Sequence, residues 1–231
     1  MQNDKKTIYI IFTIAAFFLS YLSLGWKLPP GKLLSKNVFN KSKTDTVWIF
    51  NGKDLSNLKL ISTDKNISPR KLYKIKNRTI YFNAGYLGYY RTKRIYSSYK
   101  LHAEWMWPDK SEKGNSGILV DIQPPDTVWP ECIQINFKED HAGDLIAMNG
   151  AQFREAIGKP NTTALILKKS SEKPKGMWNS CDIISRGDSL LVYVNHVLQN
   201  KATKIKVHKG MIGWQLETKP IALRNVYLIE K

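Results

Sequence analysis

The sequence predicts an all-β fold, a sandwich or barrel of antiparallel strands, preceded by an N-terminal hydrophobic helix. Beyond Val47 the chain switches repeatedly between short alternating runs and turn residues, and no stretch of about twelve residues keeps a helical period. Short strands at such regular spacing are typical of sandwiches and barrels. Residues 47–231 also suit one domain, because such folds often reach about 200 residues in a single unit.

Nine of these runs are expected to be strands. They cover residues 79–82, 99–107, 116–122, 132–137, 164–167, 179–185, 189–194, 210–216 and 221–229. Clusters of Gly, Pro, Asn and Lys separate them, as turns require. The tripeptide Arg186-Gly187-Asp188 lies between two runs and predicts a tight β-hairpin.

Alternation along three of these strands separates an apolar face from a polar one, because successive side chains point to opposite sides of a sheet. The residues on the polar faces are Cys132, Gln134 and Asn136 in one strand, Gln215 and Glu217 in the second, and His102, Glu104 and Met106 in the third. Such a face could line a groove for a sugar. It could equally be a solvated sheet surface, which periodicity alone favours.

The N-terminus has the pattern of an export signal. Two lysines in residues 1–6 precede residues 7–26, which carry no charge and are long enough to span a bilayer as a helix. No Cys follows this run, which excludes a lipoprotein anchor. Residues 1–26 are therefore expected to be a signal peptide or signal anchor, residues 27–46 a linker, and the domain periplasmic or at the cell surface. An uncleaved segment 7–26 would make the membrane a partner.

The chain is strongly basic, with 36 Lys and Arg against 19 Asp and Glu and a net charge of +17. These lysines are scattered, and no zinc-ligand spacing, recognition helix or RNA-binding aromatic motif accompanies them, so nucleic acid is not expected as a partner. An anionic membrane or an acidic polysaccharide fits the charge as well. Cys132 and Cys181 are too few for a disulfide scaffold and are expected to be unpaired.

Four blocks of the sequence together resemble one family. They are residues 46–59 (TVWIFNGKDLSNLK), 113–150 with Asn-Ser-Gly, Trp-Pro-Glu-Cys-Ile and Ala-Gly-Asp, 178–203, and 210–228 with its Arg-Asn pair. In this order they are similar to the 3-keto-disaccharide hydrolase domain family, over about residues 46–230. The resemblance implies a concanavalin-like jelly-roll sandwich, an exported setting and activity on oxidised glycosides.

The chemistry that the resemblance implies is proton abstraction followed by elimination. A ketone at C3 acidifies the C2 hydrogen, so a general base can remove it, the C1 substituent leaves, and water adds later. Such a site needs a base and a stabiliser for the enolate, for which a divalent cation is one candidate. No other cofactor is implied.

The family motifs map onto this chain residue by residue. Glu217, which matches a family glutamate, and Glu104, which lies on the polar face of its strand, are the candidate catalytic residues. The candidate substrate-binding residues are Asn115, Ser116, Gln134, Asn136, Gln215, Arg224 and Asp144. The polar faces of these strands are expected to form one shared face. One departure matters most: the family usually has Glu and then Gln where this chain has Gln134 and Asn136. An amide cannot act as a base.

Three functions follow. The first is an enzyme that cleaves a 3-keto-glycoside, and the second is a non-catalytic carbohydrate-binding domain at the cell surface, which the amide at Gln134 favours. The third is an adhesion or structural domain without a small-molecule site. The first two share carbohydrate as the expected partner.

Overall fold

The computed structural model describes residues 46–108, 113–217 and 219–231. The predicted signal segment 1–26, the hydrophobic run 7–26 within it and nearly all of the predicted linker lie outside these residues. Within the described part of the chain, no helix is long and apolar enough to cross a membrane.

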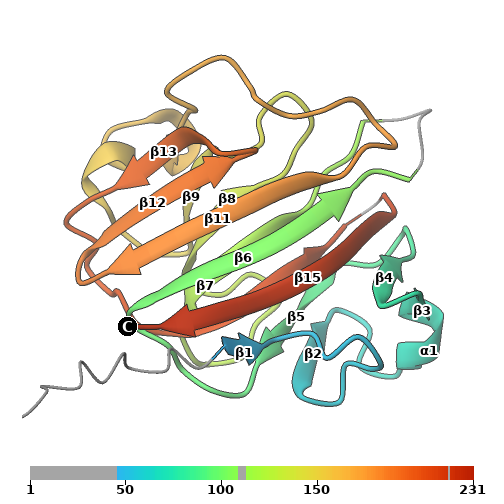
Figure 1. Ribbon diagram of the computed structural model, residues 1–231. Helices are drawn as coiled ribbons and strands as arrows, with labels where there is room; N and C mark the ends of the chain where they lie inside the picture. The colour runs from blue at the N-terminus through green and yellow to red at the C-terminus, as the bar shows by residue number, and fades with distance from the viewer. Residues whose placement is uncertain (1–45, 109–112, 218) are drawn as a thin grey trace, which may run out of the picture. The chain divides into compact units, whose positions relative to one another are not determined.

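The described residues form two antiparallel sheets (Figure 1). Sheet A has the order β13-β12-β11-β6-β15-β4-β3, with β1 paired to β15, and sheet B the order β10-β9-β8-β7-β14-β5-β2. The strands of sheet A are β1 (Thr46–Trp48), β3 (Tyr73–Lys76), β4 (Thr79–Phe82), β6 (Tyr99–Met106), β11 (Asn179–Arg186), β12 (Ser189–Val194), β13 (Val197–Ala202) and β15 (Ile221–Glu230). Those of sheet B are β2 (Leu58–Ser62), β5 (Gly88–Thr92), β7 (Gly117–Ile122), β8 (Cys132–Asn136), β9 (Leu145–Met148), β10 (Thr163–Ala164) and β14 (Met211–Leu216).

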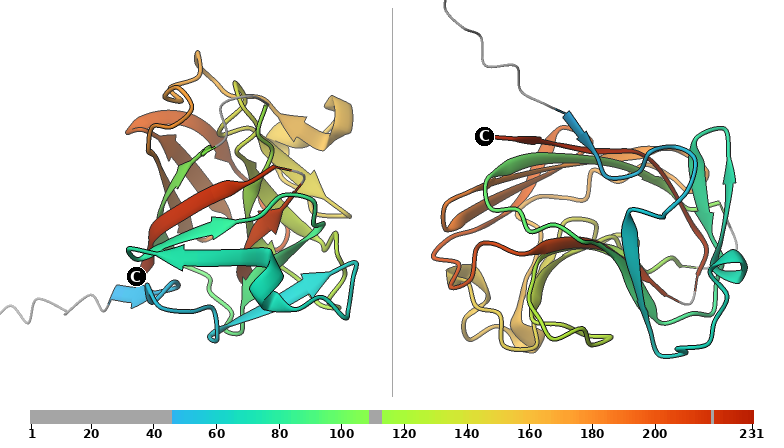
Figure 2. Two further views of the ribbon diagram at one scale, coloured as in Figure 1. Left: turned by 90° about the vertical axis from the view of Figure 1, so that its right-hand side faces the viewer. Right: turned by 90° about the horizontal axis from the view of Figure 1, so that it is seen from below.

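The two sheets lie face to face, as the views in Figure 2 show. Helical structure in the described chain is limited to α1 (Pro69–Leu72) and two 3-10 turns, η1 (Arg154–Ala156) and η2 (Pro160–Thr162). The architecture is therefore the predicted all-β sandwich.

The core lies between the sheets and follows the predicted alternation. Leu101, Ala103 and Trp105 of β6 are fully buried against the inward side chains of β8. Trp105 stacks on Phe137 with ring centroids 4.1 Å apart and planes 8° apart. Such a pair adds about 0.5–1.5 kcal/mol beyond its buried area.

Sheet B has a second apolar cluster on its outer face. Its buried members are Ile61, Tyr89, Leu119, Ile122, Cys132 and Met211. The loop 123–131 folds back toward this face, because Asp126 pairs with Arg91 (2.7 Å) and the Tyr89 hydroxyl donates to the Thr127 carbonyl (3.0 Å). This part of the outer face of sheet B is therefore covered. Periodicity alone had favoured a solvated sheet surface.

Most predicted strands are confirmed within a residue or two, and Gly187-Asp188 forms the predicted two-residue hairpin between paired Arg186 and Ser189. The predicted strand 164–167 is wrong in extent, since β10 ends at Ala164. The Ile166 N–H donates instead to an oxygen of the Asp144 carboxylate (2.8 Å). Cys132 and Cys181 are both free and buried, as expected.

Candidate functional site

A chain of side-chain hydrogen bonds crosses the outer face of sheet B. Gln134 Nε2 donates to Gln215 Oε1 (2.7 Å), and Gln215 Nε2 donates to Glu217 Oε1 (2.8 Å). We call Gln134, Gln215 and Glu217 the amide relay. Gln134 and Gln215 are only 5% and 4% exposed, and Glu217 is half-buried. The relay therefore runs from a buried amide to a more accessible carboxylate.

Glycine at position 117 makes room for the relay. Gly117 lies on β7 between the strands that carry Gln134 and Gln215. A Cβ at this position would lie 3.0 Å from Gln134 Nε2 and 2.7 Å from the Ile135 carbonyl oxygen. Only a residue without a side chain lets the Gln134 amide pass over the middle strand, so this glycine of the Asn-Ser-Gly motif has a steric role.

The register of sheet B places a polar row at the end of the relay. Ile118 of β7 pairs with Trp214 of β14, so the same antiparallel register puts Asn115 opposite Glu217. On its other side Asn115 lies opposite Lys138, because the β7–β8 pairing continues through the bond from Phe137 N to the Ser116 carbonyl (2.8 Å). Opposed side chains on neighbouring strands are about 4.5–5.5 Å apart at Cβ.

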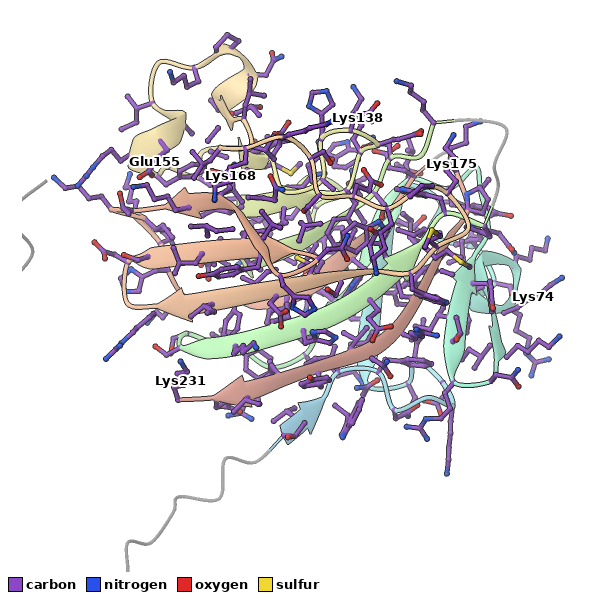
Figure 3. All side chains as sticks on the ribbon, turned by 45° about the horizontal axis from the view of Figure 1, so that its top comes forward. Lys74, Lys138, Glu155, Lys168, Lys175 and Lys231 are labelled. Carbon is purple, nitrogen blue, oxygen red and sulfur yellow. The ribbon has the colours of Figure 1, made fainter. Side chains whose placement is uncertain are left out.

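Lys138 lies two residues beyond the end of β8 and is exposed (Figure 3). The row Lys138–Asn115–Glu217 therefore brings a cation, an amide and a carboxylate together on the outer face of sheet B. The sequence analysis did not select Lys138. Its place two residues after Asn136, on the same face of the strand, was the signal that could have found it.

The remaining predicted residues on sheet B have structural bonds. The Ser116 hydroxyl donates to the backbone carbonyl of Gln215 (2.7 Å) and so connects β7 to β14. Asn136 is buried and its Oδ1 accepts from Lys138 N (3.0 Å), whereas no described residue bonds its Nδ2. Asp144 is buried, accepts from the Ile166 N–H and lies 3.0 Å from His141 Nδ1. Asp144 thus fixes a loop.

Glu104 and Arg224 lie elsewhere. They belong to β6 and β15 of sheet A, where they are opposed in register, and Arg224 Nε donates to Glu104 Oε2 (2.6 Å). Their side chains alternate with the buried Trp105 and Leu223, so they point out of the sandwich on the side opposite to Glu217. The expectation of one shared polar face is wrong, because it could not assign strands to sheets.

The surroundings of Glu104 suit a structural ion pair. Burial alone would raise the pKa of Glu104, but hydrogen bonds from Asn225 (2.8 Å) and Arg224 outweigh it and hold this pKa below its usual range. The Arg224 guanidinium also lies 3.9 Å from the centre of the Trp178 ring. A carboxylate bonded in this way is a weak base, because protonation removes the charge that strengthens both hydrogen bonds.

A further carboxylate with a shifted pKa lies at one end of the sandwich. Glu172 accepts from Trp107 Nε1 and from Asp140 N, both at 3.1 Å. Burial raises the pKa of Glu172 to about 7, although these two bonds oppose the shift. The sequence analysis did not select Glu172, since it lies in a loop without periodicity.

Among the described residues, no group of three or more His, Cys, Asp or Glu side chains is placed to hold a metal ion.

Comparison with known proteins identifies the sequence class. The family model of 3-keto-alpha-glucoside-1,2-lyase-like domains matches residues 45–229. A comparison with curated protein sequences finds no match.

Solved structures share the fold. A protein of Parabacteroides distasonis that is provisionally named a glycosyl hydrolase superimposes with a TM-score of 0.58 at 16% identity, over 80% of this chain and 94% of that chain. The β-glucanase of Bacillus licheniformis gives 0.56 at 12% identity over 80% and 96%. The carbohydrate-binding module CBM66 of Bacillus subtilis gives 0.54 at 10% identity over 75% and 96%. At these identities the likeness shows the jelly-roll fold alone.

Proposed function

The chain belongs to the family of 3-keto-alpha-glucoside-1,2-lyase-like domains, and on that premise we propose that it cleaves 3-keto-glycosides by elimination across C1 and C2. The observation that carries the proposal is the amide relay, which orients one carboxylate, Glu217, at the accessible end of an otherwise buried polar face. Glu217 is the proposed general base.

The reaction begins with removal of the C2 proton by the Glu217 carboxylate. The electron pair of the C–H bond becomes the enolate, with its charge on the C3 oxygen. The C1–O bond then breaks, and the leaving oxygen takes a proton from solvent. The products are an enone and the free alcohol, and later addition of water to the enone makes the net reaction a hydrolysis. A positioned base contributes about 10²- to 10⁴-fold to such a step.

The enolate needs hydrogen-bond donors near the base. Lys138 and Asn115 share the row of Glu217, and the Asn136 Nδ2 group bonds no described residue. Donors already in place stabilise charge as it develops without a reorganisation cost. We assign Lys138 and Asn115 to the enolate oxygen, and Asn136 to a sugar hydroxyl.

Gln134 is compatible with this role despite replacing the family Glu. The side-chain amide nitrogen of Gln215 donates to Glu217. The side-chain oxygen of Gln215 therefore faces residue 134 and needs a hydrogen-bond donor there. An ionised carboxylate at position 134 has none. Glutamine at position 134 thus keeps the amide nitrogen of Gln215 directed at Glu217.

The test is release of the alcohol from a 3-keto-glucoside by the full-length chain and by Glu217→Gln. We expect turnover to fall at least about 100-fold in the variant. Glu104→Gln is the matched control, since it makes the same change on sheet A, and it should keep turnover. Loss of turnover in the control with none in Glu217→Gln would contradict the assignment.

The second candidate is a non-catalytic carbohydrate-binding domain, which the amide at Gln134 favours. The two candidates differ in what Gln134→Glu does: restoring the family carboxylate should create activity in a binding domain and reduce it in the enzyme described above.

We also propose that the chain is exported, on the uncharged run 7–26 after two lysines. Cell fractionation with detection of the chain tests this, and sequencing the N-terminus of the mature protein separates a cleaved signal from an anchor. Recovery only with cytoplasmic proteins would contradict it.

A further inference from the structure

A cavity of about 610 Å³ opens beside the edge of sheet B, between β2 and the loop 123–131. Its lining combines hydroxyl, charged and aliphatic side chains, from Lys59 to Lys65 on one side and Asp126, Thr127 and Val128 on the other. Pockets that hold small molecules measure about 300–1,000 Å³. The cavity is thus large enough for a sugar ring and offers hydrogen-bonding groups on both walls.

The register of sheet B connects this cavity to the amide relay. Gln215 pairs with Tyr89 of β5, and Tyr89 pairs with Ile61 of β2, which lines the cavity. One row further, the same register places Leu87 beside Glu217 and Thr63 beside Leu87, and Thr63 N donates to the Leu87 carbonyl (3.2 Å). Two strand spacings separate Thr63 from Glu217, which is about 10 Å.

Leu87 lies between the base and the cavity and is 39% exposed. The exposed aliphatic side chain of Leu87 offers an apolar surface on which the C–H face of a sugar ring can pack. A ligand with its C2 atom at Glu217 can therefore extend over Leu87 and place its next unit beside Thr63.

The far wall of the cavity is held rigidly. Asp126 accepts from Arg91 Nε (2.7 Å) and Nη2 (2.8 Å), and it pairs with Lys59 Nζ (2.7 Å). The Tyr89 hydroxyl holds the Thr127 carbonyl. A wall fixed before the ligand arrives loses little conformational entropy on binding.

We propose that this cavity is the subsite for the leaving group of the substrate, which is a second sugar in a disaccharide, and that Thr63 and Thr127 contact this sugar. The orientation rests on the proposed function, because it takes Glu217 as the base at C2. Thr63 and Thr127 determine specificity, whereas the amide relay acts on the oxidised ring.

Binding by the full-length Glu217→Gln variant tests the cavity without turnover. Calorimetry compares a 3-keto-disaccharide, oxidised in the ring whose C1 carries the second sugar, with methyl 3-keto-glucoside. We expect Thr63→Trp and Thr127→Trp, each added to Glu217→Gln, to raise the dissociation constant of the disaccharide at least about tenfold, which corresponds to about 1.4 kcal/mol. The methyl glycoside should bind within about twofold of its original affinity, since it has no second ring.

Thr46→Trp is the matched control, because Thr46 is exposed on β1 of sheet A. It should change neither dissociation constant. Equal weakening of both ligands by Thr63→Trp would place the oxidised ring in the cavity and overturn the proposal, as would no effect on either. A wild-type chain that binds the disaccharide through Thr63 but releases no alcohol would contradict the proposed function and leave the sugar site in place.

Discussion

Gln134 and Gln215 are joined by a 2.7 Å hydrogen bond that passes over the strand between them. The bond has one direction, since Gln215 donates onward to Glu217 and must accept from Gln134. Two amides thereby set the orientation of one carboxylate. This relationship connects residues 81 positions apart in the chain, and it makes Gln134 part of the site without acid–base chemistry of its own.

Gln134→Glu reverses the polarity at the start of the relay. The new carboxylate faces the Gln215 carbonyl, so Gln215 turns its N–H₂ toward position 134 and its oxygen toward Glu217. We expect alcohol release from a 3-keto-glucoside to fall at least about tenfold, because hydrogen bonds to a charged group are worth about 1.5–3 kcal/mol. Steady-state turnover measures it. A gain in turnover would support the binding-domain candidate instead.

Gly117→Ala should damage the relay and the sheet together. The added Cβ would meet Gln134 Nε2 and the Ile135 carbonyl at 3.0 and 2.7 Å. We expect a loss of about 1–3 kcal/mol in the free energy of unfolding, measured in urea, and a parallel loss of turnover. Gly85→Ala, where no atom lies within 4 Å of the new Cβ, is the control for turnover. An unchanged urea midpoint for Gly117→Ala would contradict the steric role of Gly117, since it would mean that the sheet accommodates the added methyl group without loss of stability.

Asp121 should make stability fall as pH rises. The side chain is buried, its Oδ1 has no hydrogen-bond partner among the described residues, and burial raises its pKa to about 7. The folded state then binds a proton that the unfolded state releases near pH 4, so the free energy of unfolding decreases between about pH 4 and 7. The contribution is on the order of 4 kcal/mol. Urea unfolding across this range measures it.

Asp121→Asn carries no titrating proton, so its unfolding curve should lack this part of the pH dependence. Glu172 shifts in the same direction, which means that the difference between the wild type and the variant is the informative quantity. Identical slopes in the two proteins would contradict a buried, protonated Asp121.

Glu172 should report its ionisation through Trp107. The Trp107 Nε1–H donates to Glu172 Oε1, and this bond strengthens when the carboxyl loses its proton near its raised pKa of about 7. We expect a change in tryptophan emission with a midpoint near pH 7. Glu172→Gln should abolish it. A midpoint that survives in the variant would assign the signal to another tryptophan.

The sequence was sufficient for the fold class because alternation survives where one strand face is buried and the other polar. β4 and β12 match their expected bounds, and β6 and β11 differ by one residue. β5 and β9 were missed for a physical reason: β5 is buried on both faces and β9 is apolar throughout, so neither alternates. β1 has only three residues, too few to show a period, whereas β3 alternates as Tyr-Lys-Ile-Lys and could have been found.

The site could be predicted only in part. Alternation placed Gln134 and Asn136 on one face, and Gln215 and Glu217 on another, but no local pattern says which strands are neighbours. The order β8-β7-β14 joins these faces, while β6 and β15 carry Glu104 and Arg224 to the other sheet. Alternation beyond Asn136 could have found Lys138, whereas only the register of sheet B places Thr63 near Glu217.

The most direct test of the account follows deuterium from C2 of a 3-keto-glucoside into water during incubation with the full-length chain. The C3 ketone acidifies the hydrogens at C2 and C4 alike, so a second sample labelled at C4 is an internal control. The account predicts release from C2 well above the buffer rate, none above it from C4, and loss of the C2 release in Glu217→Gln but not in Glu104→Gln. Undiminished C2 release by Glu217→Gln would contradict the assignment of Glu217 as the base.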